Sequence, residues 1–544
     1  MADVDVVVIG SGAGGLTAAV ALARAGKKVL VCEQHDVPGG WCHSFRLGGH
    51  QFSPGVHYLG EMAEGGRLRT VYEGLGIDEL TLLELNPDGY EHTIIGDTRF
   101  DFPKGKDRLA ERLKQRFPHE AKGIDGYLDL ASKVTHELTT AFRDKRKRAL
   151  LTLPLRAPNL LRFGLRSLDS VMSGFIKDPT LKAILSIQAG DHGIGPKDVP
   201  AAVHFGVQAH YFDGGWYPKG GGQSLPKAFL RQLKKHGGEL KVKTGVAQIL
   251  VEGGRAIGVR LADGTQVRAN IVISNADPHV TYGRLLRHED VSSAIHKKLA
   301  KTEYSISALS LFMAADADLA GMGMDSGNYW YADSPDVQAG YDVCNRTKLD
   351  MDTFPSQFLT VTTLKDRAKG NGKTHTMESF VFVGWKAFQQ WAHTRYGERP
   401  ADYASMKEDM TKKMLRGVDR IVPGLSQQVT FAEIGTPLTN AHYCMSTQGN
   451  LYGTAKSRWQ VGPFSWPLRT EIKGLWMVGA STVSHGVLGA TMSGLLAAAS
   501  ALKVRSDDLL TGHGSLTLLP ADDVSAWPVD LQERVANKRD AAAK

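Results

Sequence analysis

The chain has 544 residues, of which 42% are hydrophobic and 22% are charged. One hydrophobic core stops growing at roughly 250–300 residues, so this length predicts at least two packed units, and the composition excludes a fibrous or wholly disordered protein. The net charge of +8 leaves nucleic acid and anionic membranes open as partners. Four scattered cysteines without a CxxC pair argue against a disulfide framework and a zinc site, so no metal is expected.

The N-terminus favours a cytoplasmic location. It lacks the basic region and cleavage site of a secretory signal, and its apolar run, residues 6–9, is too short to cross a bilayer. We therefore expect a cytoplasmic protein, and a basic segment further along the chain leaves peripheral attachment to the cytoplasmic membrane face open.

Residues 5–33 carry the pattern of a β-α-β unit. A short β-branched run at 5–9 predicts a buried parallel strand that stops at Gly10, and small apolar residues at helical spacing follow. The run at 28–32 predicts the second strand, which ends on Glu33. We therefore expect a Rossmann-like α/β fold here.

The turn of this unit has the G-x-G-x-x-G spacing of a dinucleotide-binding loop. In such a loop the first glycine turns the chain, the second admits pyrophosphate to the backbone, and the third lets the helix approach the strand. The helix N-terminus then offers amides and a positive dipole end to the phosphates. The residues expected at the diphosphate are Gly10, Gly12, Ala13, Gly14 and Gly15.

The segment after the second strand favours FAD over NAD. Glu33, with Gln34 beside it, is placed to accept hydrogen bonds from ribose hydroxyls, and a carboxylate there disfavours a 2′-phosphate. A second glycine pair within 38–44 suits close backbone approach to the same diphosphate from its other side. The contacts expected from this run are Gly39, Gly40, Trp41 and Ser44.

A distant glycine-rich element predicts the other end of the same cofactor. An apolar run at 475–478 predicts a strand, and glycines then lead into a helix. This helix N-terminus would bring its positive dipole end to the pyrimidine side of the flavin, where negative charge develops on reduction. The alternative is a small-residue helix start that only packs. The expected contacts are Gly479, Ala480, Gly486, Val487, Leu488 and Gly489.

Strand and helix patterns divide the remaining chain. Strand signals between 239 and 274 indicate a hairpin-rich insertion that returns the chain to the nucleotide sheet. The cofactor domain is therefore expected to be discontinuous, with the pieces 1–75, 215–285 and 445–510. The interleaved substrate domain is expected to combine 75–215, which has a helical pattern, with 285–445, which has a mixed α+β pattern. The tail, 511–544, is expected to be a loosely packed surface extension.

A basic, leucine-rich segment spans residues 143–166. It carries eight lysines and arginines against one acid. One interpretation is a membrane-surface anchor, in which leucines enter the interface and basic side chains meet anionic headgroups. The other is a solvated, charged helix face. Nucleic acid is disfavoured because Phe163 is the one aromatic residue of the segment and no nucleic-acid module accompanies it.

A set of motifs is spread over most of residues 4–505. The first is E-x-H-…-P-G-G-x-x-x-S-F, from Glu33 to Phe45. The others lie at 52–60, 215–221, 274–276, 436–440, 451–453 and in the glycines after 474–476. Together these motifs resemble those of the phytoene desaturase superfamily, in particular its retinol saturases and carotenoid cis–trans isomerases.

This resemblance implies a two-dinucleotide-binding fold of the glutathione-reductase type with amine-oxidase-like topology, non-covalent FAD, a lipophilic polyene-like substrate and peripheral membrane attachment. It places Val246 at the adenine, Asn275 with the cofactor, and His57 and Tyr58 at the flavin. His57 would donate a proton or position substrate, or would only hydrogen-bond the backbone or flavin.

The predicted reaction is hydride exchange that saturates or desaturates a carbon–carbon double bond. Residues 485–488 depart from the pattern of both saturases and desaturases, so the direction stays open. One dinucleotide fingerprint is present, so we expect a transient electron partner: NAD(P)H, a quinone or oxygen. Three alternatives remain: a polyene isomerase without net redox change, a flavin amine oxidase, and a non-enzymatic prenyl-protein escort, which the intact fingerprint disfavours.

Overall fold

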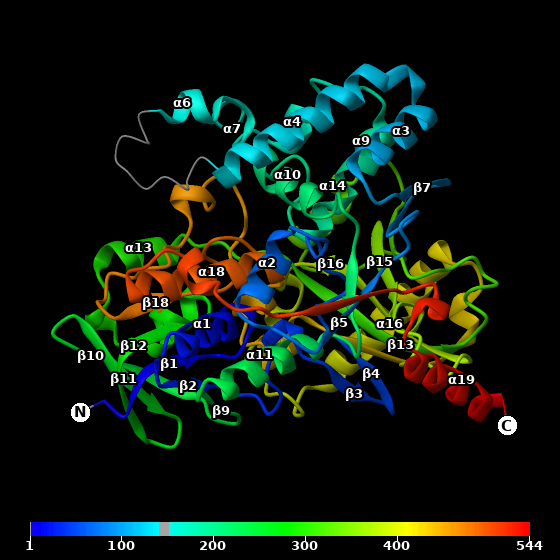
Figure 1. Cartoon of the computed structure of the whole chain (residues 1–544). Coiled ribbons are helices and arrows are strands. Elements are labelled where there is room, and N and C mark those ends of the chain that lie inside the picture. The colour runs from blue at the N-terminus through cyan, green and yellow to red at the C-terminus, as the bar shows by residue number, and fades with distance from the viewer. Residues whose placement is uncertain (1, 141–151, 544) are drawn as a thin grey trace.

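The predicted β-α-β unit starts the first sheet of the protein. The computed structural model describes residues 2–140 and 152–543 (Figure 1). The unit consists of β1 (Val4–Ile9), α1 (Ala13–Arg24) and β2 (Val29–Cys32), with β1 and β2 parallel. All four residues of β2 and the last four of β1 are buried, as in a sheet that is covered on both faces.

Strands from two later stretches of the chain complete this sheet. Its order is β10-β11-β12-β1-β2-β9, and β18 pairs with β12. β12 runs parallel to both β1 and β18, whereas β10, β11 and β12 form antiparallel hairpins, which is the predicted insertion. The added strands are β9 (Glu239–Lys241), β10 (Val246–Glu252), β11 (Arg255–Leu261), β12 (Gln266–Ser274) and β18 (Leu475–Met477).

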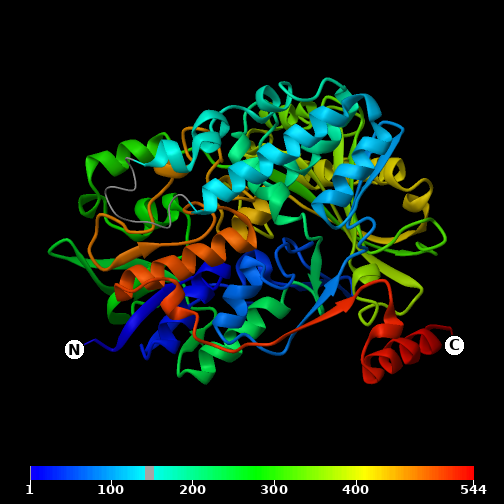
Figure 2. The ribbon, with the colours of Figure 1, turned by 45° about the horizontal axis from the view of Figure 1, so that its top comes forward.

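Two helices far apart in sequence pack closely over this sheet. α18 (Gly486–Leu502) lies beside α1 in both Figure 1 and Figure 2. Small residues permit this approach, because a Cβ atom on Gly494 would lie 2.1 Å from the carbonyl oxygen of Gly14. α11 (Ser224–Lys235) also contacts α1 and contributes Leu225 and Phe229 to the same core.

A second, mixed sheet has the order β17-β13-β16-β15-β14-β6-β7. α16 (Ala401–Ile421) packs on one of its faces through Met410, Met414 and Val418. The strands are β6 (Glu91–Ile95), β7 (Thr98–Phe102), β13 (Ser307–Asp316), β14 (Asn328–Ala332), β15 (Ser356–Val361), β16 (Thr374–Val383) and β17 (Val429–Gly435).

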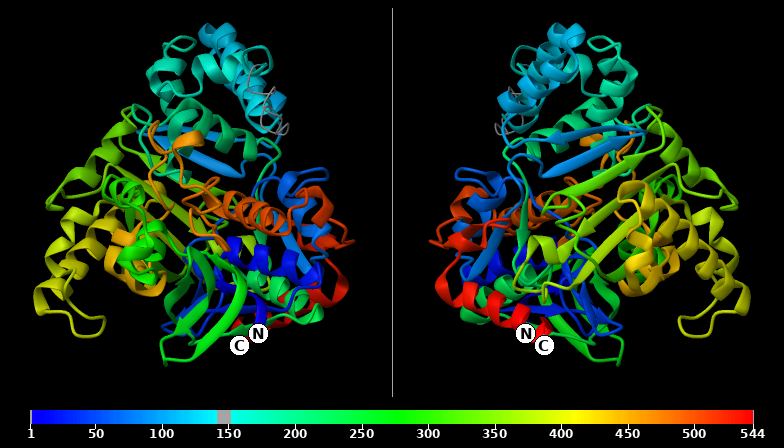
Figure 3. Two further views of the ribbon diagram at one scale, coloured as in Figure 1. Left: turned by 90° about the vertical axis from the view of Figure 1, so that its left-hand side faces the viewer. Right: turned by 90° about the vertical axis from the view of Figure 1, so that its right-hand side faces the viewer.

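Helices from the stretch 106–210 stand above the sheets in both views of Figure 3. Their core includes Phe358 and Trp330 from the second sheet, which joins the two layers. The longer helices are α3 (Lys106–Arg116), α4 (Ala121–Thr140), α9 (Pro179–Ser186) and α10 (Ala201–His210). Short helices α6 (Leu153–Arg156), α7 (Pro158–Phe163) and α8 (Leu168–Met172) lie between α4 and α9 in the chain.

The helical pattern predicted for 75–215 is wrong for its first part. Residues 80–102 form β5 (Leu80–Glu84), β6 and β7 instead. β6 and β7 are joined by a tight turn at Gly96, which has φ 56°, and β6 pairs with β14, more than two hundred residues later. The pairing partners lie too far along the chain for local periodicity to reveal them.

The C-terminal tail is docked rather than loosely packed. β19 (Leu516–Pro520) pairs in parallel with β5, whose other neighbour is β8 (Trp216–Pro218). The next turn buries Trp527 against Leu83, and α19 (Val529–Ala543) follows at the lower right of Figure 1. The short apolar run of β19 pairs with β5 although the surrounding sequence is highly charged.

Candidate functional site

A cavity of about 320 Å³ lies at the N-terminal ends of α1 and α18. The last residues of β1 and β2, Ile9 and Cys32, also border it, and ligands of open α/β sheets bind at the carboxyl ends of strands. The cofactor residues predicted from the sequence that line it are Gly10, Gly12, Ala13, Gly14, Glu33, Gln34, Gly39, Gly40, Trp41, Val246, Asn275, Gly479, Ala480, Gly486 and Val487. Those outside its lining are Gly15, Ser44, Leu488 and Gly489.

The glycine turn between β1 and α1 is shaped by backbone contacts. Gly10 has φ +89°, which favours glycine. A Cβ atom on Gly15 would lie 2.2 Å from the carbonyl oxygen of Gly10, so the strand and helix meet there without room for a side chain. Gly15 N also donates to Oδ1 of Asn275 at 3.1 Å. Gly15 therefore fixes the shape of the glycine turn without lining the cavity itself.

Glu33 is a buried carboxylate at the end of β2. Its Oε2 accepts hydrogen bonds from the amide of Ser11 (2.9 Å) and from Oγ of Ser11 (2.6 Å), and its Oε1 accepts one from the amide of His35 (2.9 Å). A carboxylate offers about four lone-pair positions, so Glu33 can still accept a hydrogen bond from a ligand hydroxyl in the cavity. The protein bonds hold it in the orientation that this role needs.

The second glycine pair approaches the first glycine turn. The amide of Gly39 donates to Oγ of Ser11 at 3.0 Å, and a Cβ atom on Gly40 would lie 3.2 Å from Cα of Gly12. Both glycines have positive φ, at 128° and 54°. Ser44 turns away instead, because its amide and hydroxyl bond the side chain and amide of Gln223.

Two helix N-termini face the cavity without a side-chain cap. The N-cap residues are Gly12 for α1 and His485 for α18, and neither side chain accepts a bond from its helix. Uncapped helix starts leave amides for an anionic ligand. Together with the glycine cradle and Glu33, these starts fit a dinucleotide with one diphosphate and one electron-accepting ring.

His57 borders the cavity and lies beside a buried acid. Its Nε2 lies 3.2 Å from Oε2 of Glu378 on β16. Its ring packs against Phe358 and Phe380, with centroids 5.2 and 5.7 Å away. The other carboxylate oxygen of Glu378 accepts a bond from the amide of Ser53 at 2.6 Å. The imidazole therefore lies beside a buried carboxylate and packs against two aromatic rings.

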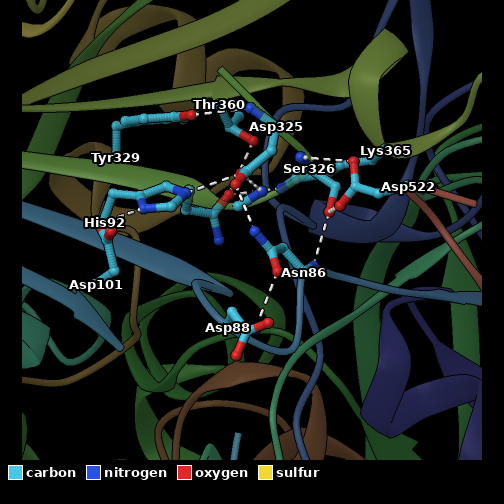
Figure 4. A network of polar contacts seen from close by, with 12 residues as sticks. Asn86, Asp88, His92, Asp101, Asp325, Ser326, Tyr329, Thr360, Lys365 and Asp522 are labelled. Atoms are coloured by element: carbon cyan, nitrogen blue, oxygen red, sulfur yellow. Dashed lines mark hydrogen bonds and ion pairs between the residues drawn. The ribbon is translucent and has the colours of Figure 1, made fainter. Parts of the chain in front are cut away.

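A buried lysine stands behind His57. Nζ of Lys365 donates to the carbonyl oxygen of His57 and to Oδ1 of Asn328, both at 2.5 Å. Burial lowers the pKa of Lys365 to about 7, against the attraction of Glu378. Figure 4 shows this lysine at one edge of a polar network that continues through Ser326 to Asp522 of the tail. The C-terminal tail thus contacts the scaffold of the site.

The same network includes a histidine clamped between two acids. His92 on β6 contacts Asp101 through Nδ1 (2.7 Å) and Asp325 through Nε2 (2.8 Å) (Figure 4). Its pKa is raised, because hydrogen bonds and attraction from the two carboxylates outweigh the larger single effect of burial. This side chain joins two strands of the second sheet and lies outside the cavity lining.

Tyr58 points away from the cavity, although its neighbour His57 borders it. Its hydroxyl lies 2.6 Å from Oδ2 of Asp191 and 3.0 Å from Oε2 of Glu91, and its ring stacks on Tyr211. Burial raises the pKa of Asp191 to about 7. Burial and the repulsion from Asp191 raise that of Glu91 to about 8.

Several lining residues escaped the sequence interpretation. They come from the second sheet, from the end of α17 (Pro437–Tyr443) and from the segment after it: Ala308, Ser310, Phe380, Tyr443, Cys444, Met445, Ser446 and Tyr452. Tyr452 lies within a segment that carries the family resemblance, which was the one signal available for it. The others carry no local motif, because their role depends on which strands the second sheet brings to the cavity.

Comparison with known proteins assigns the family. Residues 13–309 match the model of the flavin containing amine oxidoreductases, which is more than half of the chain. The protein belongs to this family. FAD as the cofactor, an oxidoreductase activity and the α/β fold predicted from the sequence are confirmed with it.

This flavoprotein also has curated relatives over most of its length. It is 32% identical to the all-trans-retinol 13,14-reductase of Danio rerio, covering 93% of this chain and 86% of the relative. It is 26% identical to the chloroplastic prolycopene isomerase of Arabidopsis thaliana, covering 91% and 82%. The predicted resemblance to retinol saturases and carotenoid isomerases is confirmed.

Solved structures support the fold of the flavoprotein. Cyclohexylamine oxidase from Brevibacterium oxydans superposes with a TM-score of 0.61 over 92% of this chain and 99% of the other, at 16% identity. This likeness bears on the fold alone. Across residues 2–140 and 152–543, no helix combines the length and apolar character needed to span a membrane.

Proposed function

We propose that this flavoprotein acts on carbon–carbon double bonds of a lipophilic polyene, as a saturase or desaturase. The observation that carries the proposal is the 32% identity to a retinol 13,14-reductase over 93% of the chain. The wall of the cavity on the side of the second sheet agrees with a lipophilic substrate, because it includes Ala308, Phe380 and Leu451.

The residues of the chain would divide the binding of the cofactor. The α1 start and the Gly39–Gly40 pair would hold the diphosphate, Glu33 the ribose hydroxyls, and Val246 the adenine. The α18 start, with Gly479 and Ala480, would border the flavin ring. Bound FAD supplies hydride exchange. His57, held by Glu378, would position the substrate against the ring while Phe358 and Phe380 keep water away.

Isomerisation without net redox change is the second candidate. The observation that favours it is the 26% identity to a prolycopene isomerase over 91% of the chain. The two reactions give products of different composition. A saturated product has two more hydrogens than the substrate, whereas an isomer has the same number of hydrogens as the substrate. Amine oxidation and prenyl-protein escort lack a comparable observation beyond the shared fold.

The electron partner is proposed to be transient: NAD(P)H, a quinone or oxygen. Support comes from the sequence, which contains one dinucleotide fingerprint and therefore one built nucleotide site. A soluble or membrane-borne donor would then reduce the flavin in a separate encounter.

The test is anaerobic. The purified holoprotein is photoreduced and mixed with a panel of carotenoids, retinoids, unsaturated lipids and amines, while the flavin absorbance is followed and products are identified by mass. Reoxidation coupled to a product two hydrogens heavier supports saturation. A product of unchanged mass formed with the flavin still reduced supports isomerisation. Indifference of oxidised and reduced flavin to every polyene, or bleaching by an amine with peroxide release in air, would overturn the proposal.

A membrane surface is proposed as a further partner of the segment 143–166. Residues 143–151 of that segment lie outside the described residues. In the described remainder, Leu155, Leu161 and Leu165 are exposed, at 85%, 53% and 51%, and Arg162 and Arg166 lie over the ring of Phe163. Exposed leucines beside basic side chains suit the interface of an anionic bilayer.

Liposome co-sedimentation tests this partner. A variant with Leu155, Leu161 and Leu165 changed to serine is compared with one that changes the exposed Val504 and Val529, which lie on other elements. We expect the leucine variant to lose binding to anionic vesicles and the valine variant to keep it. Equal binding by both would remove the segment from the proposal.

A further inference from the structure

Two carboxyls and five tyrosines form a cluster next to the cavity. The acids are Asp191 and Glu91. The phenols that interact electrostatically with Asp191 are those of Tyr58, Tyr90, Tyr211, Tyr341 and Tyr452. Two histidines lie beside the cluster: His92 next to Glu91, and His485, which hydrogen-bonds the backbone of Asp191. His192, His210 and Lys456 are the titratable groups around His485.

The geometry of Tyr58 requires a proton on the acids. Its single hydroxyl contacts Asp191 at 2.6 Å and Glu91 at 3.0 Å. A phenol has one proton to donate, so the second contact is a full hydrogen bond only when one carboxyl is protonated and donates to the phenol oxygen. The raised pKa values of both acids agree, since two buried carboxylates this close cannot both ionise near neutral pH.

Tyr452 connects this cluster with the cavity. Of the seven clustered residues, all of them described, it alone lines the cavity. Its hydroxyl donates to the carbonyl oxygen of Gly190 at 2.8 Å, one residue before Asp191. The turn at Gly193 packs tightly against the ring of Tyr452, because a Cβ atom on Gly193 would lie 2.7 Å from this ring. The ring also packs 5.7 Å from that of His485, the residue that precedes α18.

The cluster has polar atoms that the described protein leaves unbonded. These are Oε1 of Glu91, Nε1 of Trp330, and Nδ1 of His192 and His485. Trp330 lies against Gly190, and the ring of His192 packs 6.3 Å from that of His485. Buried polar groups are nearly always satisfied, by protein or by ordered water.

We propose that Tyr452 donates the proton that completes reduction of the substrate double bond, and that Asp191 restores the proton to Tyr452 through this cluster. The inference rests on the proposed function. Bound FAD would supply hydride to one carbon of the double bond and Oη of Tyr452 would give the proton to its neighbour, so that the π bond is replaced by two C–H bonds. Asp191 gives its proton to the phenolate and is then reprotonated from solvent.

Asp191 suits this task better than a surface acid would. A phenolate in a buried site is unstable, because burial already raises the pKa of Tyr452 far above that of free tyrosine. A neighbouring carboxyl that keeps its proton near pH 7 transfers it to a phenolate readily, yet an ordinary carboxyl with a pKa near 4 would hold no proton to give.

Stopped-flow reoxidation of the reduced holoprotein by its polyene tests the proposal. We expect Tyr452→Phe and Asp191→Asn to slow this step by about 100-fold or more, the usual contribution of a positioned acid. FAD content and reduction of the flavin should be unchanged. The wild-type rate should fall as the pH rises through about 7 to 8 and should show a solvent deuterium effect, and Asp191→Asn should lose this pH dependence.

Tyr282→Phe is the matched control, since that buried hydroxyl has no hydrogen-bond partner among the described residues.

Infrared spectroscopy provides a readout that does not depend on turnover. The wild type at pH 6 should show the carbonyl bands of two protonated carboxyls, Asp191 and Glu91, and Asp191→Asn should remove the Asp191 component while the Glu91 component stays. Wild-type rates in both variants, or no Asp191 component in the wild type, overturn the assignment while the proposed function stands. If no polyene reoxidises the wild-type flavin, the proposed function falls and takes the assignment with it.

Discussion

At the scale of single residues, the site depends on two kinds of position: those with no room for a side chain and those where an acidic side chain is buried. Gly15 leaves no space for a Cβ atom between β1 and α1. Glu91 and Asp191, by contrast, are acids kept where water is scarce. Both features follow from burial, so a substitution at either kind of position should have a measurable effect.

Gly15→Ala should abolish retention of FAD. The added methyl group would lie 2.2 Å from the carbonyl oxygen of Gly10, so the turn must open and the amides of the α1 start must move. Flavin absorbance per protein after desalting measures the loss. Gly206→Ala is the control, because Gly206 lies in α10 with open space around its Cα and the exchange should be neutral or stabilising by about 0.5–1 kcal/mol. Full flavin content in Gly15→Ala would contradict the expectation.

Glu91→Gln should flatten the pH dependence of stability. The folded-state pKa of Glu91 is about 8, above that of an unfolded glutamate, so the folded protein binds more protons than the unfolded chain between about pH 4 and 8. Stability from this group is therefore complete below about pH 4 and is lost as the pH rises to about 8, with a slope of up to about 1.4 kcal/mol per pH unit. Urea unfolding from pH 5 to 8 measures the slope, and equal slopes in both proteins would refute the assignment.

At the scale of elements, the cavity is made by two helices that start at one place. α1 and α18 are separated by more than 450 residues, yet their uncapped N-termini both line the cavity. Their closeness depends on small residues along the contact, where Gly494 faces the backbone of Gly14. The position of α18 is therefore set by close packing of its backbone against that of α1.

Gly494→Ala should weaken FAD binding although Gly494 lies outside the cavity lining. Its Cβ atom would lie 2.1 Å from the carbonyl oxygen of Gly14, so α18 must shift away from α1 and carry Gly486 and Val487 with it. Titration of apoprotein with FAD, followed by flavin fluorescence, gives the affinity. We expect a loss of about 10-fold or more, and an unchanged affinity would show that the two helices adjust independently.

At the scale of the whole molecule, segments late in the chain pack against segments near its beginning. β18 joins the first sheet, and β19 joins β5, which lies more than four hundred residues earlier in the chain. The tail also reaches the second sheet, where Asp522 accepts bonds from Ser326. The tail is consequently part of the core that supports the site, not an appendage.

Trp527→Ala should destabilise the protein by about 3–5 kcal/mol, the usual cost of removing a buried aromatic side chain. The indole is 3% exposed and its Nε1 donates to the carbonyl oxygen of Pro520, so the change opens a cavity and removes a bond. Chemical unfolding monitored by circular dichroism measures the loss. Val529→Ala, at 70% exposure, should change stability by less than about 0.5 kcal/mol. A small effect of Trp527→Ala would mean that the tail is only loosely attached.

The sequence by itself determined the first β-α-β unit, the hairpin insertion, the glycine turns and the cofactor. These features are local: a strand, a glycine spacing and a helix start occupy neighbouring residues, and their periodicity and backbone freedom can be read directly. The acid at Glu33 was found in the same way. The strands at 80–102 and 516–520 were missed, because their short apolar runs acquire meaning only through partners far along the chain.

Only the tertiary structure decided which side chains face the cavity. Adjacent residues such as His57 and Tyr58 separate to opposite sides, one toward the cavity and the other toward Asp191 and Glu91. The pKa values of those acids depend on burial by segments that are distant in sequence, and the cavity wall of Ala308, Ser310 and Phe380 depends on the order of strands in the second sheet. Burial and long-range pairing are properties of the packed chain, so no local pattern could have specified them.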